Sequence, residues 1–385
     1  MLTRRLSDVI VVGAGVVGAA CASYAVGAGL RVTVIDRGPV AGGTTGAGEG
    51  NLLVSDKAPG PELELSLLSM KLWTDLAGGL PSRIEYEAKG GLVVARDAAG
   101  MAALAEFAAR QREAGVEAVE VPADRLNDLE PHLAAGPAGG FHYPGDAQVM
   151  PALAAAHLLR GCGEHVTLRL GEEVTAILRG ASGEVRGVRT SRGEIHAPYV
   201  VNAAGVYGGE LARLAGVDLP VLPRRGFVLV TEPLPRVVRH KVYAADYVAN
   251  VASGSAALQT SAVVEGTPAG PVLIGASRER VGHDRTLSVP ALRRLAAGAT
   301  ALFPVLAGVR AMRTYAGFRP YLPDHLPAIG SDPRVPGLLH ACGHEGAGIG
   351  LAPVTGLVVA RCLTGGEQPL DIGPFRPERF PSSAA

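Results

Sequence analysis

Three glycines near the N-terminus have the spacing of a phosphate-binding turn. The segment Gly13-Ala-Gly15-Val-Val-Gly18 directly follows the apolar run Val9–Val12, which is typical of a buried strand. Gly13 permits a tight turn, Gly15 lets a pyrophosphate approach the backbone, and Gly18 allows a helix to pack closely on the strand. The unpaired N–H groups that open that helix would then face the negative charge of the phosphates.

A carboxylate at the end of the next apolar run extends this pattern. A helix predicted over Ala19–Val26 leads to the strand-like segment Arg31–Ile35, which ends at Asp36. Asp36 can accept hydrogen bonds from the ribose hydroxyls of an adenosine and would repel a 2′-phosphate. The glycines alone would also suit a turn in an unrelated sheet, but strand, turn, helix and acid together predict a dinucleotide-binding unit. They do not decide between NAD and FAD.

A second glycine-rich segment, residues 42–51, lies shortly after the acid. Its backbone could run close to a flat, phosphate-linked ligand, and a plain surface loop is the alternative. A helix is predicted after Pro61, because leucines recur at helical spacing on both sides of Trp73.

Composition excludes several classes of protein. The chain has 385 residues, 48% of them hydrophobic, so two to three domains are expected and a disordered chain is excluded. Lys and Arg number 36, as do Asp and Glu, which argues against a general nucleic-acid binder. The four cysteines have no CxxC spacing and no accompanying histidine cluster. We therefore expect no metal site, no disulfide framework and a reducing compartment, the cytoplasm.

The uncharged stretch between Asp8 and Arg31 could be mistaken for a signal peptide or a membrane span. Its glycines make it a poor spanning helix, and the strand, turn and helix described above account for it better. We therefore expect no membrane span.

The middle of the chain has the pattern of a mostly antiparallel sheet. Strand-like segments alternate with turn residues, and one helix, at 289–301, interrupts them. The strand-like segments are 226–231, 242–251, 258–264 and 272–274. Such a sheet could carry a substrate pocket. Near its end stands Arg319, whose planar guanidinium could bind a carboxylate through two parallel hydrogen bonds or form a surface ion pair.

Five landmarks spread along the chain carry a resemblance to a known family. They are the N-terminal unit, Thr44-Thr45-Gly46-Ala47, Val200-Val201-Asn202-Ala203-Ala204-Gly205, Ala316-Gly317-Phe318-Arg319-Pro320 and Gly343-His344-Glu345-Gly346-Ala347-Gly348. Together they resemble the D-amino-acid oxidase superfamily of FAD-dependent amine and amino-acid oxidoreductases, which includes glycine and sarcosine oxidases. Segments 48–56 and 258–266 look closest to the β-subunit type of D-hydroxyproline and proline dehydrogenases.

The resemblance implies an α/β fold and a cofactor. A doubly wound, Rossmann-like FAD-binding domain is expected to be interleaved with an antiparallel-sheet substrate domain. The FAD-binding domain would comprise residues 1–80, 142–215 and 325–385, and the substrate domain residues 81–141 and 216–324. Cys342 is not at the position where sarcosine oxidases attach their flavin, so we expect FAD to be bound non-covalently.

The resemblance also implies a reaction. We expect oxidation of the C–N bond of a small amino or imino acid, proline-like, D-hydroxyproline-like or a D-amino acid. Hydride would pass from Cα to flavin N5 and leave an imine. The alternatives are a glycine- or sarcosine-type oxidase that uses O₂, and a non-catalytic, flavin-carrying electron-transfer or assembly subunit. In the dehydrogenase branch, electrons would leave through partner subunits.

Within this resemblance, Arg319 matches the position that binds the substrate carboxylate, and Tyr247 lies where the family places a tyrosine over the substrate. Both are expected to be catalytic, although Tyr243, four residues earlier, could be the true match. Glu345 is a candidate contact for a substrate amine or hydroxyl, with a solvated position as its alternative. Glycine oxidase has an arginine where this chain has Gly346, which here would leave room for a ring.

The residues expected to contact FAD come from the first turn and its acid, the second glycine loop, the strand at 173–177, and two later glycine turns. His344 is expected to contribute a backbone contact rather than a general base. The full set is Gly13, Gly15, Val16, Val17, Gly18, Asp36, Arg37, Gly43, Thr44, Thr45, Ala47, Gly48, Glu49, Gly50, Asn51, Val174, Ala204, Gly205, Gly317, Arg319, His344, Glu345, Gly346, Ala347, Gly348 and Ile349.

Overall fold

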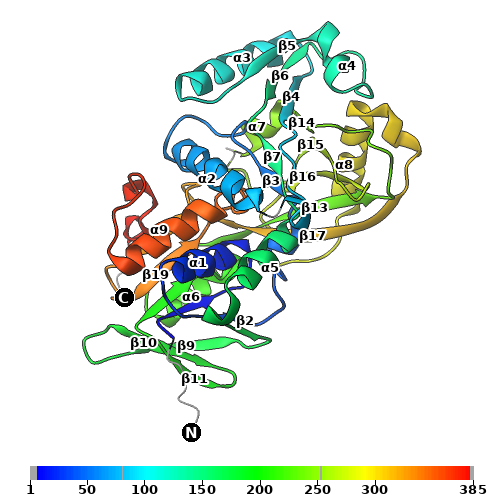
Figure 1. Cartoon of the computed structure of the whole chain (residues 1–385). Helices are drawn as coiled ribbons and strands as arrows, with labels where there is room; N and C mark the ends of the chain where they lie inside the picture. The colour runs from blue at the N-terminus through cyan, green and yellow to red at the C-terminus, as the bar shows by residue number, and fades with distance from the viewer. Residues whose placement is uncertain (1–6, 80, 252–253, 382–385) are drawn as a thin grey trace.

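Two large β-sheets organise the chain in the computed structural model, which describes residues 7–79, 81–251 and 254–381 (Figure 1). The first sheet and its helices form the lower part of the view in Figure 1, and the second sheet forms the upper part. Segments far apart in sequence contribute to each sheet, so the chain passes between them several times.

The first sheet has six strands in the order β18-β19-β12-β1-β2-β8. The central strand β1 runs parallel to β12 and β2, and only the edge strand β18 is antiparallel to its neighbour. The strands are β1 (Val9–Val12), β2 (Val32–Asp36), β8 (Val166–Leu170), β12 (Tyr199–Asn202), β18 (Ala328–Ser331) and β19 (Leu338–Cys342). Parallel strands covered on both faces read as continuous apolar runs, and Val9–Val12 is such a run.

Different layers cover the two faces of this sheet. One face packs against α1 (Val16–Gly27), α2 (Pro61–Gly78), α5 (Pro151–Gly161) and α9 (Ala352–Thr364). The other packs against α6 (Gly208–Leu214) and a three-stranded sheet of β9 (Val174–Arg179), β10 (Val185–Thr190) and β11 (Gly193–His196). Small residues let α1 and α9 approach closely, since a Cβ at Gly356 would lie 2.7 Å from the carbonyl oxygen of Ala20.

The second sheet has eight strands in the order β17-β13-β16-β15-β14-β4-β6-β5. All neighbours are antiparallel except β14 and β4, which are parallel. The strands are β4 (Gly91–Ala95), β5 (Val119–Pro122), β6 (Gly139–Tyr143), β13 (Leu222–Thr231), β14 (Lys241–Ala244), β15 (Gln259–Gly266), β16 (Val272–Arg278) and β17 (Ala311–Tyr321). Helix α8 (Val289–Leu302) packs on one face, and α3 (Ala98–Glu113) packs with the opposite cluster of core residues.

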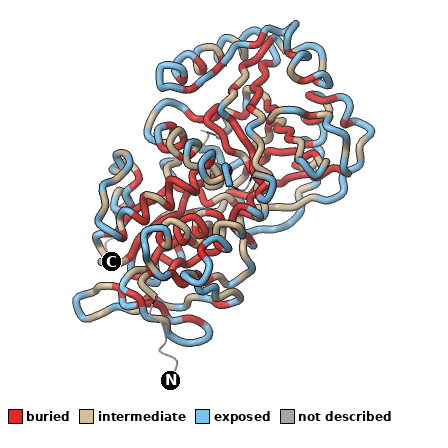
Figure 2. Tube along the Cα trace, viewed as in Figure 1, coloured by how far each residue is buried: buried red, intermediate tan, exposed pale blue. Residues whose placement is uncertain are grey.

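The shorter elements are α4 (Leu126–Leu129) and a two-stranded ladder of β3 (Asn51–Leu52) and β7 (Ala147–Gln148). Buried residues follow the central strands of both sheets and the inner faces of their helices (Figure 2). Among the described residues, no helix has the length and apolar character needed to span a bilayer.

The α/β class expected from the sequence is confirmed, with two differences in detail. The strand predicted over 242–251 is wrong in its second half, because β14 ends at Ala244 and the chain continues as α7 (Asp246–Val251). The turn into α7 brings the rings of Tyr243 and Tyr247 to 5.0 Å between centroids. The domain boundary expected between residues 141 and 142 falls inside β6, which belongs to the second sheet.

Candidate functional site

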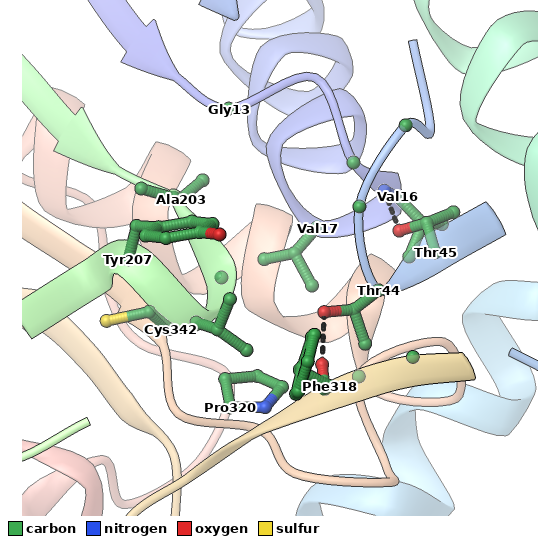
Figure 3. Close-up of a pocket in the computed structure, with 18 of the residues that line it drawn as sticks. Gly13, Val16, Val17, Thr44, Thr45, Ala203, Tyr207, Phe318, Pro320 and Cys342 are labelled. Carbon is green, nitrogen blue, oxygen red and sulfur yellow. Dashed lines mark hydrogen bonds between the residues drawn. The ribbon is translucent and has the colours of Figure 1, made fainter. Parts of the chain in front are cut away.

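A cavity of about 670 Å³ extends from the β1–α1 turn to the edge of the second sheet. Five segments contribute most of its wall: the β1–α1 turn, the loop 42–51, residues 203–214, strand β17 and the loop that follows β19. Figure 3 shows residues from the β1–α1 turn, the loop 42–51 and β17, together with Tyr207 and Cys342, around one space. The segments are distant in sequence, so only the fold brings them together.

Hydrogen bonds order the end of the cavity next to α1. The carboxylate of Asp36 accepts from the backbone N–H of Ala14 (2.8 Å) and of Gly38 (2.7 Å). The hydroxyl of Thr45 accepts from the N–H of Val16 (3.0 Å), which ties the loop 42–51 to the start of α1 (Figure 3). These bonds hold the acid and the N-terminus of the helix in the arrangement that a dinucleotide pyrophosphate and ribose require.

The first two glycines of the motif lie where a side chain would meet neighbouring atoms. Gly13 has φ +118°, and a Cβ there would lie 2.2 Å from the carbonyl oxygen of Ala203. A Cβ at Gly15 would lie 3.0 Å from the Thr45 hydroxyl, within the cavity wall. Gly18 does not line the cavity; a Cβ there would lie 2.0 Å from the carbonyl oxygen of Gly13, so its role is close packing.

Aromatic and basic residues form the opposite wall at this end. The guanidinium of Arg37 lies 3.7 Å from the ring centroid of Tyr207, which lines the cavity (Figure 3). The Tyr207 ring also stacks on His283, with 5.0 Å between centroids. Sequence reasoning missed Tyr207, although it follows the turn Ala203-Ala204-Gly205, which was expected to approach the cofactor. Val174 lines the cavity as expected.

Arg319 lines the other end of the cavity. Its Nη1 donates to the carbonyl oxygen of Ser277 (2.9 Å), and no ion pair among the described residues includes it. The guanidinium lies over Gly226, where a Cβ would be 2.3 Å from Nη1. Desolvation and the nearby charge of Arg278 lower the pKa of Arg319. A cationic group held in this way is suited to bind an anion.

The two candidate tyrosines occupy different environments. Tyr247, on α7, lines the cavity, and the guanidinium of Arg278 lies 5.1 Å from its ring centroid. Tyr243 is fully buried in the core of the second sheet and donates its hydroxyl hydrogen to Ser55 (2.5 Å). The alternative that Tyr243 contacts the substrate is therefore wrong for this cavity: its side chain belongs to the core.

Glu345 lines the cavity with φ +47° and is already paired. It forms a short ion pair with Arg224, and His325 Nδ1 lies 3.1 Å from its Oε2. Burial alone would raise the pKa of Glu345, but the hydrogen bond from His325 and the charge of Arg224 lower it to about 2. The solvated position, which was the alternative to a substrate contact, is excluded because the side chain is buried. Arg224 was missed, although strand alternation places it on the same face as Gly226.

His344 and Cys342 are uncharged groups in the cavity wall. Burial lowers the pKa of His344 to about 3, and its Nε2 lies 3.0 Å from the hydroxyl of Thr355. A ring with so low a pKa is a weak proton acceptor, and the expected backbone contact of His344 with the cofactor stays a prediction. Burial raises the pKa of the Cys342 thiol to about 12, so it stays protonated and is a poor nucleophile toward a flavin.

The structure brings together most residues expected to contact FAD. Gly18 and Ala347 are the exceptions: Gly18 packs behind the turn, and Ala347 lines a smaller cavity beside Tyr247. The long cavity, with a phosphate-type turn at one end and an arginine at the other, fits the extended shape of FAD. When bound, FAD supplies the hydride-accepting chemistry. Within the described residues, no group of three or more His, Cys, Asp or Glu could hold a metal ion.

Comparisons with known proteins agree with this geometry. Residues 8–362 match the family model DAO, described as FAD dependent oxidoreductase. Hydrogen cyanide synthase subunit HcnC of Pseudomonas aeruginosa is 30% identical over 99% of this chain and 98% of its own length. Glycine oxidase of the same organism is 32% identical, over 96% of this chain and 98% of its own.

Solved structures share the whole fold. The crystal structure of glycine oxidase from Geobacillus kaustophilus has a TM-score of 0.88 and 28% identity, covering 97% of this chain and 99% of that one. L-proline dehydrogenase from P. horikoshii also has a TM-score of 0.88, at 24% identity, covering 97% and 98%. Family match, fold and cofactor cavity agree: the chain belongs to the DAO family of FAD-dependent oxidoreductases and acts on CH–NH groups with FAD as its cofactor.

Proposed function

We propose that this enzyme oxidises the C–N bond of a small amino or imino acid, with Arg319 binding the substrate carboxylate and Tyr247 lying against the substrate. The observation that carries the proposal is the guanidinium of Arg319, which lines the cavity without an ion-pair partner among the described residues. An acid substrate would supply the missing anion. The residues named above as cofactor contacts would hold FAD in the rest of the cavity.

A ring-containing substrate, proline-like or D-hydroxyproline-like, is our first choice within this class, and other D-amino acids follow. The absence of a side chain at Gly346 supports it, because even a Cβ there would lie 3.7 Å from Nε of Arg319. A longer side chain at this position would occupy the space beside the guanidinium. A glycine- or sarcosine-type substrate is the smaller alternative.

We also propose a route for the electrons and a division of the chain into two domains. Electrons would leave through partner subunits rather than pass to O₂. The flavin would be bound non-covalently, because the Cys342 thiol is protonated. The protein would act in the cytoplasm. With the boundary at 141/142 moved to the end of β6, which belongs to the second sheet, the FAD-binding domain would comprise 1–80, 144–215 and 325–385, and the substrate domain 81–143 and 216–324.

The direct test is anaerobic reduction of the purified holoenzyme by a panel of D-, L- and N-methyl amino acids and cyclic imino acids. We expect bleaching of the flavin absorbance by at least one acid, and faster reoxidation by an artificial dye than by O₂. A flavin that every acid leaves oxidised would contradict the proposal and favour a non-catalytic flavoprotein. Fast reoxidation by O₂ alone would instead identify an oxidase.

A further inference from the structure

We infer that Glu49 binds the substrate nitrogen, as an acceptor of its N–H hydrogen bond, while Arg319 binds the carboxylate. The inference rests on the proposed function and narrows it to substrates that carry both an acid and an N–H donor. Glu49 was expected from the sequence only as a cofactor contact.

The side chain of Glu49 is buried without a hydrogen-bond donor. The residue is 8% exposed and lines the cavity. Its Oε1 is buried and has no partner, and its Oε2 lies 4.0 Å from Nζ of Lys241, which is an ion-pair distance rather than a hydrogen bond. Burying a carboxylate in this way is costly unless a donor arrives, so the site favours a ligand that brings one.

The other acidic residues that line the cavity have hydrogen-bond donors or ion-pair partners within the protein, or are exposed to solvent. Asp36 accepts from two backbone N–H groups, and Glu345 is paired with Arg224. The remaining three are Glu172, bonded to Arg169 and Thr190; Glu173, paired with Arg37; and Glu210, which is exposed. Among the described acids of the cavity wall, Glu49 is thus the buried one whose charge still lacks a hydrogen bond.

Lys241 and Gly275 flank the carboxylate of Glu49, and neither donates a hydrogen bond to it. Lys241 is buried and donates to Glu265 and to Asn51, so its charge is shared between the carboxylates of Glu265 and Glu49. On the other side, a Cβ at Gly275 would lie 2.2 Å from Oε1 of Glu49, so glycine at that position makes room for the carboxylate.

The two charges of the cavity wall match an amino acid. Arg319 and Glu49 line the same cavity, and the charge of Glu49 acts to raise the pKa of Arg319. An amino or imino acid in its zwitterionic form presents a carboxylate to the first and a primary or secondary ammonium to the second. A 2-hydroxy acid of the same shape would offer Glu49 fewer such donors. An ether acid would offer none and would place an oxygen lone pair against the carboxylate.

The test compares two probes of one shape: proline, and its analogue with a ring oxygen in place of the N–H group. Binding to the holoenzyme is followed by perturbation of the flavin spectrum, with anaerobic reduction monitored where it occurs. If the panel above identifies another cyclic acid or enantiomer, that acid and its ring-oxygen analogue are used. The variants are Glu49→Gln and Glu49→Ala, with Glu113→Gln, exposed on α3 and outside the cavity wall, as the matched control.

We expect both Glu49 variants to weaken binding of the amine-bearing acid about tenfold or more, since hydrogen bonds to charged groups contribute about 1.5–3 kcal/mol. Binding of the ring-oxygen analogue should be unchanged or tighter, FAD content should be retained, and Glu113→Gln should match the parent. Unchanged binding of the amine-bearing acid, equal weakening of both probes, or loss of FAD would each overturn the inference.

The experiments distinguish a failure of the proposed oxidation from a failure of the assignment of Glu49. If no acid reduces the flavin but the two probes still bind, the spectral titrations alone decide whether Glu49 distinguishes N–H from oxygen. If an acid reduces the parent enzyme and the Glu49 variants equally well at every concentration, the oxidation stands and the assignment of Glu49 is wrong.

Discussion

Individual residues of the cavity differ in how their charges are compensated. Asp36 and Glu345 have donors within the protein, and these bonds order the turn and the loop that the two residues join. Arg319 lacks an ion-pair partner among the described residues, and Glu49 lacks a hydrogen-bond donor there. A buried guanidinium without an ion-pair partner and a buried carboxylate oxygen without a hydrogen-bond donor are available to a ligand, because binding one offsets the cost of their desolvation.

At this scale we predict the effect of removing the guanidinium. Arg319→Ala should lose about 2–4 kcal/mol of transition-state stabilisation, because the substrate carboxylate would be buried without its partner. The measurement is the ratio of reduction rate to apparent Kd for each acid that the enzyme oxidises. Arg294→Ala, on the exposed side of α8, should leave this ratio unchanged. A ratio for Arg319→Ala equal to the parent's for every acid would remove Arg319 from the substrate site.

At the scale of elements, the β1–α1 turn depends on two glycines for different reasons. Gly13 has a left-handed φ and lies against backbone, whereas the nearest obstacle to a side chain at Gly15 is the hydroxyl of Thr45. The first position therefore determines whether the turn can form. The second determines how closely a phosphate can approach it.

Alanine at these two positions should separate folding from cofactor binding. Gly13→Ala should destabilise the protein by about 1–3 kcal/mol or more, because backbone strain adds to a clash with backbone. Gly15→Ala should keep its far-UV circular dichroism but lose most of its FAD affinity. Urea unfolding of the apoproteins and FAD titration measure the two effects. Equal losses of stability in both variants would contradict this division.

A buried acid ties the β3–β7 ladder to the chain after β3. Asp146 accepts from the N–H of Val54 (2.9 Å) and from the hydroxyl of Ser55. Burial raises the pKa of Asp146 to about 7, although the hydrogen bonds from Ser55 and Val54 oppose the rise. The folded protein therefore holds this proton more tightly than the unfolded chain does.

This raised pKa predicts a pH dependence of stability. Between pH 4 and pH 7 the folded state retains the proton that the unfolded state loses, so the contribution of Asp146 to stability falls as pH rises. Asp146→Asn should therefore gain stability relative to the parent over this range, by a few kcal/mol at about pH 7. The free energy of unfolding is measured across the range, with the exposed Asp75→Asn as control. A difference that does not change with pH would refute the assignment.

At the scale of the whole molecule, the cavity joins the two sheets. Its wall combines the β1–α1 turn of the first sheet with β13 and β17 of the second. The only tryptophan, Trp73, donates its indole N–H to the carbonyl oxygens of Ile349 and Gly350, in the loop before α9. A ligand that fills the cavity should therefore stabilise both halves together.

We predict that removing FAD lowers the melting temperature and that adding it back raises the melting temperature with concentration. A ligand bound only by the folded state contributes about 2.7 kcal/mol at one hundred times its Kd. In the holoenzyme, flavin release and the change in Trp73 fluorescence should occur at one temperature. Two separate transitions, with flavin released well before the Trp73 signal changes, would show that FAD does not stabilise the half that contains Trp73.

The sequence by itself determined the features that depend on neighbouring residues. Strand, turn, helix and acid between Val9 and Asp36 follow from short-range sterics and hydrogen bonding, and the structure confirms them. The mostly antiparallel sheet followed from strand-like segments separated by turn residues, but that pattern could not show that the chain turns into α7 after Ala244.

Only the tertiary structure decided which charged groups remain available to a ligand. Arg224 and Glu345 are 121 positions apart, and Glu49 and Lys241 are farther apart still, so no local pattern could show that the first pair is matched and Glu49 is left without a donor. The same holds for the choice of Tyr247 over Tyr243, which depends on the direction in which α7 leaves the sheet. Whether a polar group is satisfied depends on its neighbours in space, and those are set when distant segments pack together.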